Sequence, residues 1–186
     1  MHVNQAPAGP DIVIRRARAD EAAAFRSLRL RALADAPTAF ATTLAEAEAM
    51  PAEYWVGRVA AGAAGVANAM LVAVESATEG PGGSPATDRW VGMMVGFRDE
   101  ADTTLGHVVS VWVAPEARRL GVARRLLDAV HTWAREHGLR TLRLGVTSDN
   151  VPARRLYEQA GYRPTGHTFP LPSHPHLHEI TMECTL

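Results

Sequence analysis

Residues 106–146 contain the pattern that most restricts the fold. The apolar run GHVVSVWVAP (106–115) ends at a proline, and an amphipathic helix follows it. The apolar face of that helix comprises Ala123, Leu126, Leu127, Val130 and Ala134. Gly138 is a suitable helix stop, and LRTLRLGV (139–146) then alternates like a strand. A strand, a helix and a strand joined this closely form a βαβ unit, so we expect two parallel strands.

The rest of the chain adds strands and helices around this unit. Strands are expected at 12–17, 70–76, 89–99 and 178–186, and 77–88 is predicted to be a flexible hairpin loop rich in Gly, Pro and Ser. Helices are expected from a cap at Asp20 to about Asp35, from about Thr43 to Pro51, over 53–61, and from about Asn150 to Gly161. We therefore predict one α/β domain over 12–186, with a mixed sheet between helices, after a flexible tail of residues 1–11.

Composition limits the classes of function. The 186 residues are 47% hydrophobic, which allows one sizeable core, and 19 Lys and Arg nearly balance 20 Asp and Glu, which argues against nucleic acid as a partner. The N-terminus lacks the pattern of a secretory signal, and no run of about 18 apolar residues predicts a membrane span. A single cysteine, Cys184, suits a reducing compartment. We expect a cytoplasmic protein without a membrane partner, and leave a homodimer open.

The turn RRLGVA (118–123) has the features of an anion site. The first N–H groups of a helix lack intrahelical partners and lie at the positive end of the helix dipole, so they bind phosphate oxygens. A glycine at position 121 would let such a ligand approach. Positive charge nearby comes from Arg118, Arg119, Arg124 and Arg125. The turn matches neither the dinucleotide fingerprint nor a P-loop, and solvated arginines on an ordinary helix start are the alternative.

Two motifs in this region resemble the GCN5-related N-acetyltransferase (GNAT) superfamily. RRLGVA fits the pattern R/Q-x-x-G-x-G/A, with Ala123 where glycine is commoner. NVPARRLYEQAGYRPTG (150–166) resembles the second motif, N-x-x-A-x-x-L-Y-x-x-x-G-[FY]. The resemblance is specific over 106–166 and weaker toward the N-terminus. It implies a central, mostly antiparallel sheet with one splayed pair of parallel strands, flanked by helices.

The resemblance also implies acetyl-CoA as the cosubstrate, bound between the splayed strands. No metal is expected. Its pyrophosphate would lie on the turn and helix start formed by Arg118, Arg119, Leu120, Gly121, Val122, Ala123 and Arg124. Its pantetheine arm would pair like an added strand with the backbone of Val111, Trp112 and Val113, and Asn150 would hydrogen-bond the same arm.

Acetyl transfer needs a neutral amine, a hydrogen-bond donor at the thioester oxygen and a proton for the departing thiolate. The resemblance gives the donor role to the Val113 N–H and the general-acid role to Tyr157, whose alternative role is that of a core aromatic. An unperturbed tyrosine (pKa ~10) is a weaker acid than a thiol (~8.5), so Tyr157 must be acidified or must share a hydrogen bond. His107, expected on the same strand face as Val113, is the candidate base, with Asp99 and Glu100 as alternatives.

The remaining candidates are weaker. His174, His176 and His178 alternate, but Pro175 and the lack of an evident fourth ligand favour a solvated loop over a zinc site. Cys184 is far in sequence from both motifs and is not expected to act as a nucleophile.

We therefore predict an N-acetyltransferase that transfers acetyl directly to a primary amine of a small molecule or a protein. A non-catalytic acyl-CoA-binding or regulatory module is the main alternative, and another phosphate-ligand binder is the second. The presence of both Tyr157 and Asn150 favours the enzyme, because a simple binding module needs neither an acid nor its positioning.

Overall fold

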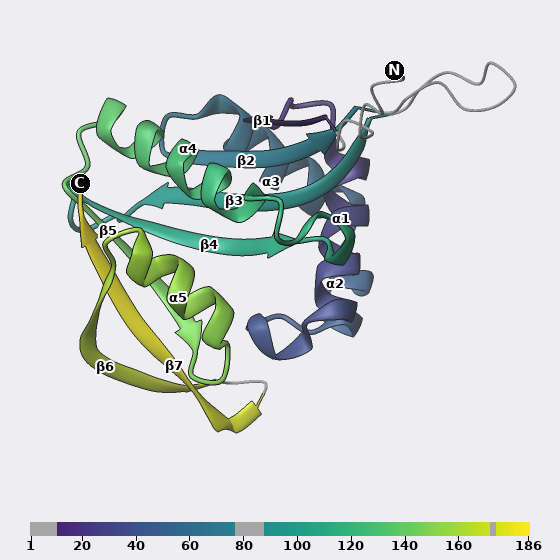
Figure 1. Ribbon diagram of the computed structural model, residues 1–186. Helices are drawn as coiled ribbons and strands as arrows, with labels where there is room; N and C mark the ends of the chain where they lie inside the picture. The colour runs from purple at the N-terminus through teal and green to yellow at the C-terminus, as the bar shows by residue number, and fades with distance from the viewer. Residues whose placement is uncertain (1–10, 77–87, 172–173) are drawn as a thin grey trace, which may run out of the picture.

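The computed structural model describes residues 11–76, 88–171 and 174–186, with backbone alone for 174 and 175. Most of the predicted tail and of the predicted flexible loop at 77–88 lie outside the described residues. Seven strands form one sheet in the order β1-β2-β3-β4-β5-β7-β6 (Figure 1). The strands are β1 (Ile12–Arg16), β2 (Asn68–Glu75), β3 (Arg89–Arg98), β4 (Leu105–Val113), β5 (Thr141–Thr147), β6 (Arg163–Leu171) and β7 (His174–Thr185).

β4 and β5 form a parallel pair that parts along its length. Their pairing runs from Leu105 opposite Thr141 to Val108 opposite Leu144, and the remaining residues of the two strands do not pair with each other. The other neighbouring strands described are antiparallel. The predicted parallel βαβ unit and the mostly antiparallel sheet with one splayed pair are confirmed. The divergence leaves a gap toward the carboxyl ends of both strands.

Helices cover both faces of the sheet, and two of them follow the strands that border the gap. In Figure 1, α4 and α5 lie in front of the sheet, whereas α1 and α3 lie behind it. Glycines let the layers approach: Gly96 of β3 lies against Trp133 of α4, and Gly62 of α3 lies against Met70 of β2. The helices are α1 (Ala22–Asp35), α2 (Leu44–Ala49), α3 (Ala52–Ala64), α4 (Val122–Glu136) and α5 (Val151–Gln159), with short 3-10 turns at Pro37–Ala39 and Pro115–Ala117. None of the helices in the described ranges is long and apolar enough to cross a bilayer.

A β-bulge interrupts the pairing of β4 with β3. Met93 lies opposite Trp112 but Val95 lies opposite Val109, so three steps on β4 match two steps on β3. Ser110 lies inside this extra step and has a φ of 54°, in the left-handed region. The bulge therefore reverses the alternation of side chains along β4.

His107 and Val113 lie on opposite faces of the sheet because of this bulge, so the prediction that they share a face was wrong. Val113 lies opposite Gly92, and a Cβ on Gly92 would touch α4, so Val113 faces that helix. His107 lies opposite Phe97, whose neighbour Gly96 faces α4, and its ring stacks on Phe97 at 4.8 Å on the other face. A regular strand would have kept the predicted arrangement.

Helix starts agree with the sequence in part. α2 begins, as expected, after Thr43, which forms a capping box with Glu46. The N-cap of α1 is Glu21 rather than the predicted Asp20, and its side chain makes no capping bond, since the carboxylate binds Arg15 and accepts from the Arg18 N–H at 2.7 Å.

The C-terminal hairpin of β6 and β7 differs from the prediction. β6 was not predicted, and β7 begins at His174, so the expected solvated loop at 173–179 is a strand over its described part. β6 is the edge of the sheet, and most of its side chains are exposed, so it lacks an apolar alternation. Prolines such as Pro164 and Pro170 are tolerated on an edge strand.

Candidate active site

The gap between β4 and β5 exposes backbone groups of β4. The Ala114 N–H donates to the Val91 carbonyl at 2.8 Å, so the preceding residue, Val113, turns its own N–H and C=O away from β3. The same alternation turns the Val111 backbone toward the gap, whereas the Trp112 backbone faces β3. Of the three predicted partners of an added strand, Val111 and Val113 thus turn toward the gap, and Val113 offers its N–H alone because its carbonyl accepts from Arg118 at 3.0 Å.

Two left-handed residues shape the turn before α4. Arg119 has a φ of 63° and Gly121, the N-cap of α4, has a φ of 74°. No described side chain caps the helix, so the N–H groups of its first turn are left for another partner. No described atom lies within 4 Å of the place a Cβ on Gly121 would take. Glycine is therefore favoured first by the backbone conformation, and the open space beside it leaves room for a ligand.

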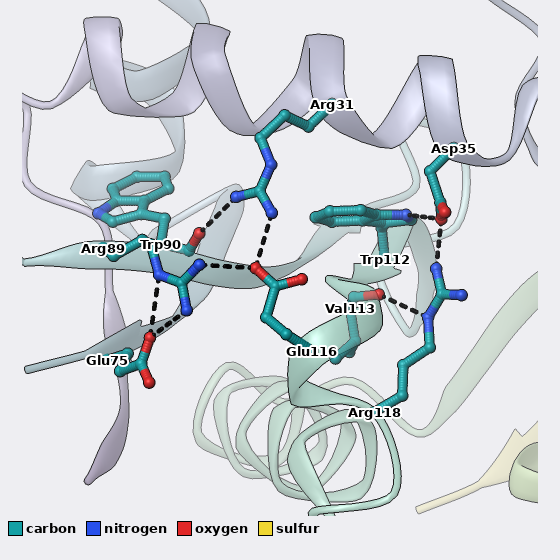
Figure 2. A network of polar contacts seen from close by, with 9 residues as sticks. All are labelled: Arg31, Asp35, Glu75, Arg89, Trp90, Trp112, Val113, Glu116 and Arg118. Atoms are coloured by element: carbon teal, nitrogen blue, oxygen red, sulfur yellow. Dashed lines mark hydrogen bonds and ion pairs between the residues drawn. The ribbon is translucent and has the colours of Figure 1, made fainter. Parts of the chain in front are cut away.

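Arg118 fixes this turn to the end of α1. Its Nε donates to the Val113 carbonyl at 3.0 Å, and its Nη2 forms an ion pair with Asp35 (Figure 2). The same Asp35 oxygen accepts a hydrogen bond of 2.9 Å from Nε1 of Trp112. One carboxylate thus joins the C-terminal end of α1, the strand beside the gap and the turn.

Glu116 holds the same turn from the other side. Its Oε1 accepts from Arg31 of α1 at 2.8 Å and from Arg89 of β3 at 2.8 Å, and Arg89 also pairs with Glu75 of β2 (Figure 2). The 3-10 turn that contains Glu116 is therefore bound to α1 and β3, and through Arg89 to β2, before α4 begins.

The remaining predicted arginines differ in their surroundings. Arg124 pairs with Asp128 one helical turn along α4 at 2.9 Å, and Arg125 donates to the Ile12 carbonyl at 2.8 Å. Arg119 is exposed. Arg119 is thus the predicted arginine best placed to move toward a ligand at the turn.

Two cavities meet at the gap. The turn-side cavity has a volume of about 720 Å³, and its walls include Arg119, Gly121 and Leu156. The sheet-side cavity has a volume of about 430 Å³, and its walls include His107 and Ser110. The residues that line both cavities are Ala39, Val111, Asn150, Ala153 and Tyr157. A molecule in one cavity can therefore reach a molecule in the other at Val111 and Tyr157.

Tyr157 lies at this junction on α5 and is 3% exposed. Burial raises the pKa of its hydroxyl, so the side chain is not acidified. Of the two possibilities that the sequence left open, a shared hydrogen bond agrees with this environment.

Asn150 is the N-cap of α5. Its side-chain oxygen accepts from the Ala153 N–H at 3.2 Å, which fixes the amide at the junction. The side-chain NH₂ is then the group that can donate to a ligand.

His107 lies in the wall of the sheet-side cavity, with its Nε2 at 2.8 Å from Oδ2 of Asp99. The hydrogen bond from His107, followed by backbone N–H groups of Asp102 and Ala101, lowers the pKa of Asp99 to about 2. Of the two alternative bases, Asp99 is therefore the hydrogen-bond partner of His107, whereas Glu100 is exposed and lines neither cavity.

The polar residues that line the sheet-side cavity and were not singled out from the sequence include Arg29, Arg58, Thr147 and Glu179. They come from α1, α3, β5 and β7, so only the fold brings them together. Thr147 and Glu179 are direct partners in the β5–β7 pair. These residues are not part of a motif. The one sequence feature that could have indicated them is that they are charged or polar residues within apolar segments.

The histidine cluster and the cysteine lie apart from this site. No group of three or more His, Cys, Asp and Glu among the described residues could hold a metal ion, and the His174 side chain is outside the description. Cys184 is buried, burial raises the pKa of its thiol, and it lines neither cavity.

Comparison with known proteins gives a family match. The model of the acetyltransferase (GNAT) family matches residues 46–162. Those residues include β4, the turn, α4, β5 and α5.

Two curated relatives match over shorter segments. A mycothiol acetyltransferase of Geodermatophilus obscurus is 38% identical over 64 residues, which is 34% of this chain and 21% of that protein. An uncharacterised N-acetyltransferase of Bacillus subtilis is 42% identical over 52 residues, which is 28% of this chain and 35% of that protein. The matched segments thus span about a fifth and a third of these relatives.

Solved structures match over nearly the whole chain. An acetyltransferase of the GNAT family from Streptococcus pneumoniae superimposes with a TM-score of 0.75 at 19% identity, covering 95% of this chain and 99% of that one. A protein of Salmonella typhimurium, described as a candidate acetyltransferase and solved with its cofactor acetyl-CoA, gives 0.72 at 19% identity, covering 95% and 94%. At these identities the likeness establishes the fold.

Proposed function

Because the chain belongs to the acetyltransferase (GNAT) family, we propose that it transfers the acetyl group of acetyl-CoA directly to a primary amine. The observation that carries this proposal is the gap between β4 and β5, where two cavities meet at Val111 and Tyr157. A thioester entering from the turn side and an amine entering from the sheet side would meet at that gap. No covalent enzyme intermediate is needed.

The residues on the turn side fit acetyl-CoA. The N–H groups of Arg119 to Arg124 lie along the turn and the uncapped start of α4, which suits a pyrophosphate. The backbone of Val111 offers a strand edge for the amide groups of the pantetheine arm, and the Val113 N–H continues that edge toward the thioester. The side-chain NH₂ of Asn150 is a further donor beside the same path.

The acyl transfer follows from these positions. The amine nitrogen attacks the thioester carbonyl carbon, the C–S bond breaks, and the amine loses one proton while CoA gains one. The Val113 N–H, which points into the gap, donates to the carbonyl oxygen as negative charge develops there. Tyr157, whose buried hydroxyl stays protonated, donates a hydrogen bond to the sulfur as it leaves, and the thiolate takes up a proton through this hydroxyl in exchange for the one that the amine releases.

His107 is the proposed base on the sheet side. Its ring is held by Asp99 and by the face of Phe97, so its orientation is fixed. It lies on the opposite face of the sheet from Val113, so a water molecule between His107 and the amine would complete the proton path.

The proposal is tested by measuring release of the CoA thiol from acetyl-CoA in the presence of a panel of primary amines. Calorimetric titration with acetyl-CoA tests binding alone. Amine-dependent release above the rate of hydrolysis supports the enzyme. Binding without amine-dependent release across the panel would favour a non-catalytic acyl-CoA-binding module instead.

The proposal also includes a cytoplasmic location and no nucleic-acid or membrane partner. A homodimer is compatible with it, and light scattering after size-exclusion chromatography measures the oligomeric state.

A further inference from the structure

Two buried side-chain nitrogen atoms among the described residues have no hydrogen-bond partner: Nη1 of Arg29 and Nε1 of Trp55. Two of the other three tryptophans donate from Nε1: Trp112 donates to Asp35 at 2.9 Å and Trp133 donates to the Gly65 carbonyl at 2.8 Å. Buried donors are almost always paired, because an unmade hydrogen bond leaves the desolvation cost uncompensated. Two orphan donors therefore indicate a missing acceptor.

Both orphan donors belong to one place in the fold. Arg29 and Trp55 line a small cavity of about 80 Å³ between α1 and α3, together with Thr42 and Arg58. Arg29, Thr42 and Arg58 also line the sheet-side cavity. The small cavity is thus an inner recess of the space that we assign to the amine.

The charges around this recess are positive and unbalanced. The Arg29 guanidinium lies over the Phe40 ring at 4.2 Å, and Arg58 lies over the Tyr54 ring at 5.9 Å. Neither arginine forms an ion pair with a carboxylate of the described residues. Burial, followed by the charge of Arg58, lowers the pKa of Arg29 to about 10, so the group stays protonated at neutral pH. A buried cation beside a second cation is costly without a counter-charge.

The other charged groups of the sheet-side cavity do not supply that counter-charge. Arg143 is paired with Glu183 at 2.6 Å, and His107 is paired with Asp99 at 2.8 Å. The Glu179 carboxylate comes from β7, beyond β5 in the sheet, whereas the two arginines come from α1 and α3. The cavity therefore has a cationic wall and a separate carboxylate wall on either side of the gap.

We propose that the acceptor is a small primary amine that also carries a carboxylate, and that Arg29 and Arg58 bind this carboxylate in the recess with Trp55 Nε1 as a third donor. A carboxylate is planar, accepts several hydrogen bonds and matches a guanidinium. Its amine end would then extend toward the gap and Glu179. A polyamine would bring a second cation to Arg29 and Arg58 instead. This inference rests on the proposed acetyl transfer.

The first experiment compares matched acceptors. Acetyl-CoA turnover is measured with a series of α- and ω-amino acids, each paired with its carboxamide and with the amine that lacks the carboxyl group. Aminoalkylphosphonates and aminosulfonates of the same lengths separate carboxylate from other oxyanions. We expect kcat/KM for the best carboxylate to exceed that of its carboxamide by at least about 30-fold. Equal or faster turnover of the carboxamides or of polyamines would overturn the inference while leaving acetyl transfer intact.

The second experiment assigns the preference to residues. Arg29→Gln and Arg58→Gln keep polarity but remove the charge, and Arg26→Gln is the control because Arg26, like Arg29, is an arginine of α1, but it is exposed and lines none of the three cavities described. We expect Arg29→Gln to reduce the carboxylate-over-carboxamide ratio about tenfold or more, and Arg26→Gln to leave it unchanged. A mere loss of folding would lower both acceptors equally, so an unchanged ratio in Arg29→Gln and Arg58→Gln counts against the inference.

A third experiment does not depend on turnover. The four tryptophans each give one indole N–H signal in a ¹⁵N-correlated spectrum, and Trp55→Phe assigns the signal of Trp55. Titration with γ-aminobutyrate and with its carboxamide should shift the Trp55 signal for the carboxylate alone, and Arg29→Gln should abolish the shift. This result would support the recess as a carboxylate site even if no amine were acetylated. Equal shifts with both compounds, or none with any carboxylate of the panel, would contradict it.

Discussion

Nε1 of Trp112 donates a hydrogen bond of 2.9 Å to Oδ2 of Asp35, a residue 77 positions earlier in the chain. The same carboxylate pairs with Arg118, which in turn binds the Val113 carbonyl. The end of α1, which borders the turn-side cavity, is therefore coupled to the turn proposed to bind pyrophosphate (Figure 2).

We expect Asp35→Ala to lower the free energy of unfolding by about 1–3 kcal/mol, because Trp112 Nε1 and Arg118 lose their acceptor. Loosening of the turn should also weaken acetyl-CoA binding several-fold. Asp35→Asn keeps an oxygen for Trp112 and should recover most of the stability. Urea unfolding and calorimetry measure the two effects, and wild-type values for both in Asp35→Ala would refute this role.

Gly121 and Gly138 provide a matched pair at the two ends of α4. They have φ values of 74° and 73°, and neither has a described atom within 4 Å of a Cβ position. Valine at either position should carry a similar backbone strain of about 1–2 kcal/mol. We expect Gly121→Val alone to weaken acetyl-CoA binding at least tenfold, about 1.4 kcal/mol. Equal affinities of the two folded variants would show that the turn does not hold the pyrophosphate.

Tyr157 and Tyr162 are neighbouring buried tyrosines whose rings lie 5.8 Å apart. Tyr157→Phe should lower kcat about 10²-fold with little change in acetyl-CoA affinity, because the hydroxyl that assists the leaving sulfur is lost. The control, Tyr162→Phe, removes a hydrogen bond of 3.0 Å to His131 and should reduce stability more than kcat. Wild-type turnover of Tyr157→Phe would leave Tyr157 as a core aromatic.

The pH profile tests His107. A histidine base works only when neutral, so kcat/KM should fall on the acidic side of the profile. This fall is the acidic limb of the pH profile. Asp99 keeps its charge down to about pH 2, so the limb cannot come from that carboxylate in an ordinary assay range. His107→Gln should lower kcat/KM and remove the limb. Asp99→Asn should also lower kcat/KM, because the ring loses the carboxylate that holds its Nε2 at 2.8 Å.

Persistence of the limb in His107→Gln would assign the base elsewhere, and Glu179 of the same cavity is then the next group to replace. A stability measurement at each pH separates loss of the base from acid unfolding.

The sequence predicts the part of the site that depends on local spacing. The turn around Gly121, the helix start at Asn150 and the parallel strands follow from short motifs, and the structure has each of them near its predicted position. These features are built from neighbours in sequence, so their patterns are visible without tertiary contacts.

The amine side could not be predicted in the same way. Arg29, Arg58 and Glu179 come from three separate elements and meet only after the sheet has formed. The bulge at Ser110 is another tertiary feature, because it is defined by the register of β4 against β3, and it alone changed the face on which His107 lies. β6 was not predicted because an exposed edge strand need not alternate apolar with polar residues.

The parting of β4 and β5 also determines how the molecule is held together. Within the sheet that the described residues form, the β1–β4 half and the β5–β7–β6 half are joined by the four residue pairs from Leu105–Thr141 to Val108–Leu144. The two halves of the sheet are therefore joined at one end, where β4 and β5 pair, and are separate at the other end. A pantetheine arm bonded to the β4 edge would stabilise the unpaired end, so acetyl-CoA would have a structural role as well as being a reactant. When CoA leaves, the two halves of the sheet would lose this contact. The rigidity of the protein would therefore differ between the CoA-bound and CoA-free steps of the reaction cycle.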